Sequence, residues 1–186
     1  MCEYCGCQDI AAIAELTREH DAVVAEIARV RVCVRDGDVD GAAAMARRIA
    51  RILRPHTEVE EHGLFPHLAD EFPDHVAGLE REHREIEAVL VRAAHGTPPD
   101  PRWPAELLAA MERLRDHILK EQDGLFPASL SILDADAWAS VETARVVAGS
   151  ALEPEPHSPG HPHDHAHHHP HDEDQHDQHA TAHQHA

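Results

Sequence analysis

The sequence predicts an all-α protein, an antiparallel up-down-up-down four-helix bundle with one additional C-terminal helix. Apolar residues recur at three- and four-residue steps along four segments, as on the buried face of an amphipathic helix. One pair of segments is duplicated, and two helical hairpins packed face to face form a four-helix bundle. The alternating apolar and polar pattern that is typical of strands is absent from the sequence.

The duplication has a short part and a long part. Arg18-Glu19-His20 recurs as Arg81-Glu82-His83. The segment from His56 to Pro66 aligns with the segment from His117 to Pro127, and both end in Gly-Leu-Phe-Pro. The two parts are separated by nearly equal lengths of chain, which indicates a tandem of two helix-pair units. Two units are too few for a solenoid, which needs about three or more.

Each expected helix has one apolar stripe that includes a histidine. The stripes are Ile13, Leu16, His20, Val23, Ile27 and Val30; Met45, Ile49, Ile52, His56 and Glu60; Leu79, His83, Ile86 and Leu90; and Leu107, Ala110, Leu114, His117, Glu121 and Leu125. The turn-forming run Asp36-Gly37-Asp38 separates the first two helices, and the Gly- and Pro-rich residues 96–101 separate the third from the fourth.

Glycine and proline positions predict where these helices end or bend. Gly63 and Gly124 stand where helix C-caps are expected, because each follows a helical pattern and precedes Leu-Phe-Pro. Pro55 lies inside the second pattern and cannot donate a backbone hydrogen bond. We therefore expect a kink or local loosening just before His56.

A further amphipathic stretch, Leu130 to Val147, follows the fourth helix. It predicts a fifth helix outside the bundle, with Asp134 or Asp136 as its N-cap. The chain then divides into three regions. Residues 1–8 form a cysteine-rich arm, residues 9–150 the bundle with its extra helix, and residues 151–186 a histidine-rich tail that we expect to be disordered.

The two ends of the chain have unusual compositions. Cys2, Cys5 and Cys7 have the spacing of a metal clip or redox arm, although a frayed terminus with accidental cysteines is the alternative. Twelve of the 20 histidines lie between His157 and His185, among Pro, Asp and Gln. We expect this tail to bind metal ions weakly, and we hypothesise that it captures metal for the bundle.

Composition excludes several classes of partner. The formal net charge is -19, with 35 acidic and 16 basic residues, and such a surface repels nucleic acid and anionic lipid. There is neither an apolar stretch long enough to span a membrane nor a signal pattern at the N-terminus. The few cysteines do not suggest a disulfide scaffold. We therefore expect a soluble, cytoplasmic protein.

The apolar stripes contain side chains that are costly to bury. His56 and Glu60 are four residues apart, as are His117 and Glu121, so each pair lies on one helix face. Two buried glutamates with no arginine or lysine on the same stripes require positive charge from elsewhere, and two metal cations would supply it. Imidazole and carboxylate suit iron, and the thiolates that would indicate structural zinc are missing from the stripes.

A simpler explanation exists for each of these residues alone. One histidine on an apolar face is more often hydrogen-bonded within the core, and one His-x-x-x-Glu is more often a surface pair. The same combination occurs in both halves of the chain at matched spacing, however, and this repetition favours a metal site.

His20, His56-x-x-x-Glu60, His83 and His117-x-x-x-Glu121 follow in this order on the four expected helices. The pattern resembles the hemerythrin-like, or HHE cation-binding, domain over about residues 8–130. The resemblance implies a di-iron centre in an up-down-up-down bundle, with two iron ions (Fe2+/Fe3+) joined by an oxo or hydroxo bridge. It also implies that Glu60 and Glu121 bridge the irons and that the four histidines cap them.

The third helix departs from the oxygen-carrier pattern of that family, which has a second histidine four residues after the first. This sequence has Glu87 there, which is either a seventh ligand or a solvated helix residue. A ligating Glu87 would make the site more anionic and would disfavour reversible oxygen carriage. Ferritin-like proteins use Glu-x-x-His on two helices. They are excluded because Glu80-x-x-His83 has no counterpart before His117.

The function expected on these grounds is that of a non-haem di-iron protein that binds or reacts with O2, peroxide or NO. Sensing, detoxification and a catalase-like activity are all admissible. A metal store or metal sensor without turnover is the alternative, and a purely structural bundle is the third possibility. The sequence leaves manganese and zinc open as the metal.

Overall fold

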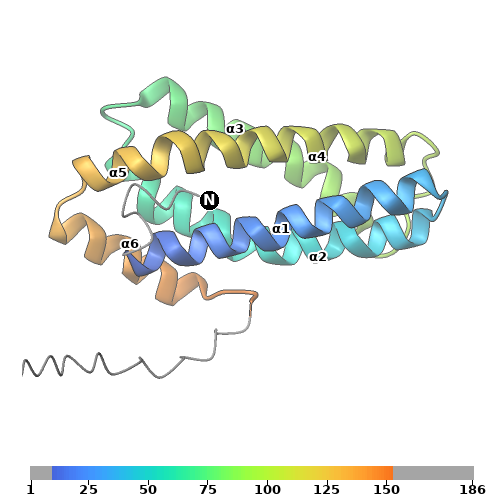
Figure 1. Cartoon of the computed structure of the whole chain (residues 1–186), viewed down its shortest axis with the longest axis horizontal. Coiled ribbons are helices and arrows are strands. Elements are labelled where there is room, and N and C mark those ends of the chain that lie inside the picture. The colour runs from blue at the N-terminus through green and yellow to red at the C-terminus, as the bar shows by residue number, and fades with distance from the viewer. Residues whose placement is uncertain (1–9, 153–186) are drawn as a thin grey trace, which may run out of the picture. The chain divides into compact units, whose positions relative to one another are not determined.

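The computed structural model describes residues 10–152, and these residues contain helices and connecting turns without any strand (Figure 1). The first hairpin consists of α1 (Ala11–Arg35) and α2 (Val39–Val59), and the second of α3 (Pro73–Leu90) and α4 (Trp103–Lys120). The expected all-α bundle is confirmed. The expected cysteine-rich arm and nearly all of the histidine-rich tail lie outside the described residues.

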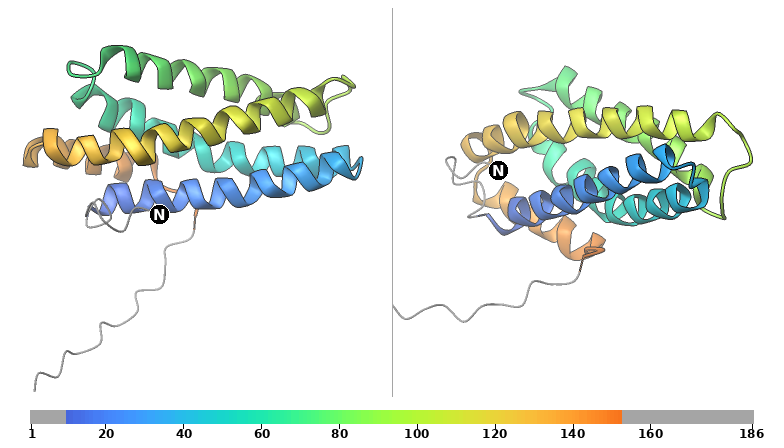
Figure 2. Two further views of the ribbon diagram at one scale, coloured as in Figure 1. Left: turned by 45° about the horizontal axis from the view of Figure 1, so that its top comes forward. Right: turned by 45° about the vertical axis from the view of Figure 1, so that its right-hand side comes forward.

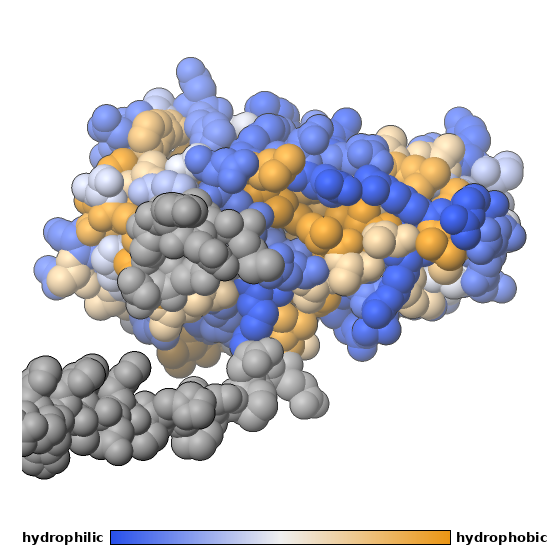
Figure 3. All heavy atoms as spheres, in the orientation of Figure 1, coloured by the Kyte–Doolittle hydropathy of each residue, from blue (hydrophilic) through white to orange (hydrophobic). Residues whose placement is uncertain are grey.

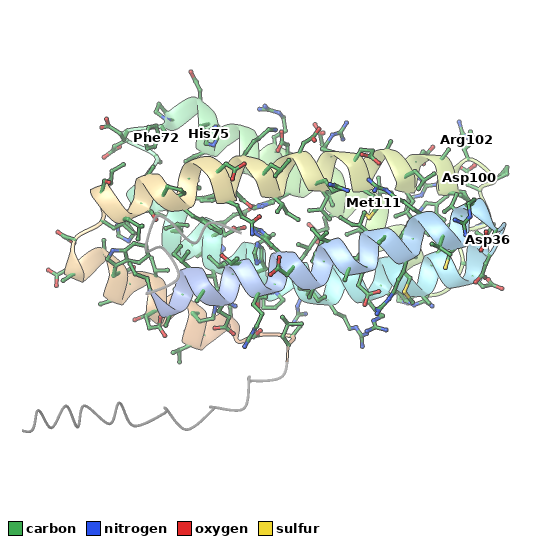
Figure 4. All side chains as sticks on the ribbon, viewed as in Figure 1. Asp36, Phe72, His75, Asp100, Arg102 and Met111 are labelled. Atoms are coloured by element: carbon green, nitrogen blue, oxygen red, sulfur yellow. The ribbon has the colours of Figure 1, made fainter. Side chains whose placement is uncertain are left out.

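The four long helices run antiparallel to their neighbours along the chain. Figure 2 shows α1 beside α2 and α3 beside α4. Asp36 in the first hairpin turn and Asp100 in the second lie at one end of the bundle, whereas Phe72 in the α2–α3 connection lies at the other end (Figure 4). Gly37 has a φ of 74°, which glycine adopts without strain, and Asp38 accepts a hydrogen bond from the Gly41 N–H at 2.8 Å.

Pro55 does not interrupt the second helix. The α-helix runs continuously from Val39 to Val59 through the proline. The short 3-10 segments η3 (Phe65–His67) and η4 (Val91–Ala93) follow the second and third helices. No helix in the described part of the chain is long and apolar enough to cross a membrane.

The two repeated motifs form π-helical turns instead of the expected C-caps. These turns are η2 (Glu60–Leu64) and η5 (Glu121–Leu125), and each begins at a glutamate of the His-x-x-x-Glu pair. Gly63 and Gly124 are not among the glycines with positive φ, so the prediction that they cap the helices is wrong. The proline that closes each motif lacks an N–H, and the wider π turn is a common feature of functional sites.

The C-terminal part of the domain forms two helices. α5 (Phe126–Ile132) continues directly from η5, and α6 (Ala135–Ala148) begins after a break. Asp134 is the N-cap of α6 and accepts a hydrogen bond from the Ala137 N–H at 2.9 Å. Asp134 is one of the two N-caps that were expected, and it starts the extra helix at Ala135, while Leu130 belongs to α5. It packs against η2, α2 and α1, on the outside of the first hairpin (Figure 1).

The hydrophobic core has two parts. One part lies toward the hairpin turns and includes Val23, Ile86 and Trp103. The other lies toward α5 and includes Leu16 and Leu79. On the face drawn in Figure 3, hydrophobic surface appears between hydrophilic edges over α1 and α4. On α1 and α3 the division between the two parts falls at a histidine, so a polar layer separates them.

Candidate metal centre

Each long helix contributes one histidine to the polar layer. His20 comes from α1, His56 from α2, His83 from α3 and His117 from α4, and all four side chains are buried. His83 is the most exposed of them, at 8 %. The rings lie in pairs, with centroids 4.5 Å apart for His20 and His56 and 4.5 Å apart for His83 and His117.

Two fully buried glutamates lie between the two histidine pairs. Oε1 of Glu60 is 3.2 Å from Nε2 of His56, and its Oε2 is 3.4 Å from Nε2 of His83. Oε2 of Glu121 is 3.2 Å from Nε2 of His20, and its Oε1 is 3.0 Å from Nε2 of His117. Each carboxylate therefore presents one oxygen to each histidine pair.

These side chains form two groups with the residue types and closeness of a metal site. The first group is His20, His56, Glu60 and Glu121, and the second is Glu60, His83, His117 and Glu121. Within each group the candidate ligand atoms all lie within 4.8 Å of one another. The two groups share both glutamates, as in a pair of metal positions bridged by two carboxylates.

The centre contains buried polar atoms that no hydrogen bond satisfies. Among the described residues, both oxygens of Glu60 and of Glu121 lack a hydrogen-bond partner, and so does Nε2 of His20 and of His56. Leaving such atoms unpaired costs roughly 1–3 kcal/mol each, and more where the group is charged. Cations at this place would satisfy them. The nitrogen and oxygen donors therefore fit an iron pair.

The charges of the centre are consistent with a cation site. Burial by itself would raise the pKa of Glu60, but His56 and His83 outweigh it and hold the pKa well below its ordinary value. Burial and the charge of Glu60 would also raise the pKa of Glu121, but His117 and His20 outweigh them and lower it. Two buried carboxylates are therefore kept ionised, which is the form that binds metal.

A second layer of carboxylates holds three of the histidines. Nδ1 of His56 is 2.9 Å from Glu19, Nδ1 of His83 is 2.8 Å from Glu61, and Nδ1 of His117 is 3.1 Å from Glu82. A carboxylate only accepts, so the proton lies on Nδ1 and the lone pair of Nε2 is left for a metal. The Nε2 atoms of His83 and His117 are 2.9 Å apart. A ring that is protonated on both nitrogens donates across this distance, whereas two Nε2 lone pairs are free for a cation.

The carboxylate of Glu19 is itself held from α6. Arg145 donates to both oxygens of Glu19 at 3.0 Å, and the Ser150 hydroxyl donates to the same carboxylate at 2.8 Å. Both Arg145 and Glu19 are buried. Glu82 has an equivalent cation in Lys120, but this pair lies nearer the surface. The extra helix is thus connected to His56 through a buried ion pair.

Aromatic rings from the duplicated motif close the centre on one side. Phe126 stacks on His20 with centroids 5.7 Å apart and planes 8° apart, and Phe65 stacks on His83 at 5.8 Å and 10°. Both phenylalanines are almost completely buried. They restrict the orientation of two histidine rings and keep water from that side.

The structure brings together six of the seven side chains that the sequence singled out. Glu87 is the exception, because its side chain is exposed and belongs to neither group. In α3 the buried position after His83 is that of Ile86, three residues on, and Glu87 is left exposed. In the other two motifs the glutamate opens a π turn and is buried.

Sequence reasoning missed the outer carboxylates and Arg145. A signal for two of them was present, since Glu19 and Glu82 are the middle residues of the repeated Arg-Glu-His. Nothing in the sequence linked Arg145 to Glu19, which lies 126 residues earlier in the chain.

Comparison with known proteins gives one match. The model of the hemerythrin HHE cation binding domain matches residues 11–129. These residues contain all four histidines and both glutamates of the centre. No curated protein and no solved structure matches the chain.

Proposed function

Because the chain belongs to the hemerythrin HHE cation-binding domain family, we propose that it holds two iron ions between its four helices and binds or reacts with O2, peroxide or NO. The observation that carries this proposal is the pair of ligand groups that share Glu60 and Glu121. His20 and His56 would hold one ion, and His83 and His117 the other.

The chemistry of the pair would come from the metal. Two ferrous ions side by side can supply two electrons to a small oxidant. The protein's own residues would bind the metal ions and orient the histidine ligands. Glu19, Glu61 and Glu82 keep Nε2 of three histidines directed inward, and the phenylalanines and aliphatic residues around the centre limit the access of water.

The outer carboxylates favour a redox role over reversible oxygen carriage. A histidine that donates to a carboxylate is a more basic metal ligand, and such ligands stabilise the higher oxidation state. Three of the four histidines have this partner. We therefore propose sensing, detoxification or a catalase-like activity in the cytoplasm. This argument against oxygen carriage rests on the outer carboxylates and does not need Glu87 as a ligand.

Storage or sensing of metal without turnover is the second candidate. It is favoured by the burial of the ligands, since all six are at most 8 % exposed and exchange would be slow. Substituting His83 by alanine separates the two candidates. A reactive centre would lose its consumption of peroxide while keeping part of its iron, whereas a store would only lose capacity.

The decisive experiment is metal analysis with an absorption spectrum of the iron-loaded protein. We expect about two iron ions per chain, one for each group, together with charge-transfer bands of a bridged ferric pair. Glu87→Gln should keep the full iron content, because Glu87 belongs to neither group, and Glu121→Ala should lose it, because Glu121 belongs to both. A single zinc ion per chain would contradict the proposal.

A further inference from the structure

A cavity with a volume of about 1040 Å³ lies beside the metal centre, and α2 and α3 supply most of its wall. All four histidines of the centre line it. Cavities of roughly 300–1,000 Å³ hold drug-sized organic molecules. O2, NO and hydrogen peroxide are far smaller, so the size of the cavity is not explained by them.

The cavity is lined by arginine in a protein that is strongly acidic. Its arginines are Arg47, Arg48, Arg51, Arg54 and Arg84, all on α2 except the last. The acidic residues that line it are Glu58, Glu61 and Glu87, and Glu61 is engaged with Nδ1 of His83. The excess of positive charge here opposes the net charge of -19 of the whole chain.

Two of these arginines have no ion-pair partner in the part of the chain that the structure describes. Arg47 donates to the carbonyl oxygen of Ala93 at 3.1 Å, and Arg48 lies 3.1 Å from Glu26. Among the described residues, no carboxylate lies within 4.0 Å of Arg51 or Arg54. Both side chains are exposed on the cavity wall. An anion at this place would meet two guanidinium groups without displacing a partner from residues 10–152.

Apolar side chains line the same cavity. Leu53 of α2 and Ile86, Leu90 and Val91 on the α3 side are part of its wall. Val91 is 57 % exposed, although it is a large hydrophobic residue. A helix rises about 1.5 Å per residue, so Arg54 and Arg51 lie roughly 3 Å and 7.5 Å along α2 from His56, and Leu90 lies roughly 10 Å along α3 from His83. The cavity therefore suits an extended molecule with a charged end and an apolar body.

We propose that this cavity binds an amphipathic carboxylate, with its carboxylate on Arg51 and Arg54 and its apolar body against Leu53, Ile86, Leu90 and Val91. His83 is the least buried of the four histidines and lies at the cavity wall, so it is where the ligand would come nearest to the centre. The proposal that the ligand binds here depends only on the arginines and the apolar wall. The idea that the ligand meets a metal there rests on the function proposed above.

Isothermal titration of the iron-loaded protein with decanoate tests the proposal. We expect saturable binding that weakens roughly 2- to 30-fold in the double variant Arg51→Gln/Arg54→Gln, the loss expected for two exposed ion pairs. The matched control is Arg81→Gln/Arg115→Gln, which removes the same charge from two exposed arginines outside the cavity and should bind like the unaltered protein. Decanol, which lacks the charge, should bind the unaltered protein more weakly than decanoate.

Three results would overturn the proposal. They are no binding of decanoate by the unaltered protein, equal weakening in the two double variants, and acetate binding as tightly as decanoate, which would remove the role of the apolar wall. The iron content of every sample is measured separately. Loss of iron would contradict the proposed function, whereas intact iron without decanoate binding would contradict only this inference. A decanoate-induced change in the absorption of the iron would support the contact at His83.

Discussion

Glu19 and Glu82 occupy equivalent positions in the two halves of the chain, yet their surroundings differ. Each directly precedes a histidine of the centre and accepts from Nδ1 of a histidine on the next helix, His56 or His117. Glu19 is fully buried and is paired with Arg145, whereas Glu82 is partly exposed. At the scale of single residues, the duplicated centre is therefore asymmetric.

This asymmetry predicts which metal position each carboxylate supports. Glu19→Gln should weaken metal binding by His20 and His56 about 10- to 100-fold, the usual effect of removing a second-layer partner, because a neutral amide accepts a weaker hydrogen bond from Nδ1 of His56 and no longer neutralises Arg145. Titration of the metal-depleted protein with ferrous iron should then show one tight and one weak position. Glu82→Gln is the matched change at His117, where partial exposure predicts a smaller loss.

Circular dichroism of both variants controls for unfolding. Two positions that remain equally tight in Glu19→Gln would contradict the positioning role of Glu19. A loss that is larger in Glu82→Gln than in Glu19→Gln would contradict the argument from burial.

At the scale of elements, α6 distinguishes the two otherwise similar π turns. A Cβ added at Gly63 would lie 2.9 Å from Cβ of Ala144 and 3.3 Å from Cα of Val141, both on α6. A Cβ added at Gly124 would meet nothing within 4 Å. Glycine is therefore required at the first turn by the close approach of another helix, and not by a special backbone angle.

The pair of glycines gives a matched test of how closely α6 packs. Gly63→Ala should destabilise the protein by about 1–3 kcal/mol, the usual cost of overpacking, because backbone of α6 lies in the way. Gly124→Ala should be neutral or stabilising by about 0.4–1 kcal/mol, since alanine loses less conformational freedom on folding. Urea unfolding measures both. Equal effects of the two substitutions would show that α6 does not pack closely on η2.

At the scale of the whole molecule, periodicity was enough to predict the bundle and its inward histidines. Stripes at three- and four-residue steps identified His20 and Glu121 as seam residues, and both are buried. The same rule left Glu87 open between a ligand and a solvated residue, because positions three and four residues after His83 are both close to the seam and neighbouring helices decide between them. Long-range partners such as Arg145 cannot be derived from a local pattern.

The position of the polar layer also has a consequence for stability. The layer divides the hydrophobic core, and its two carboxylates are buried at 0 % exposure. Without a cation they are compensated only by the histidines around them, and buried charges that lose partners are destabilising. A ligand that binds only the folded chain stabilises it by about 2.7 kcal/mol at 100 times its Kd. Metal bound at the layer should therefore stabilise both halves of the core together.

Removal of the metal should thus lower the stability of the entire bundle. We expect the iron-loaded protein to lose at least about 2–3 kcal/mol of unfolding free energy after chelation, measured by urea unfolding. The double variant Glu60→Gln/Glu121→Gln is the control, because it removes both shared ligands and both buried charges. Its stability should not respond to the chelator. Equal stability of the unaltered protein before and after chelation would contradict a metal role in holding the two parts of the core together.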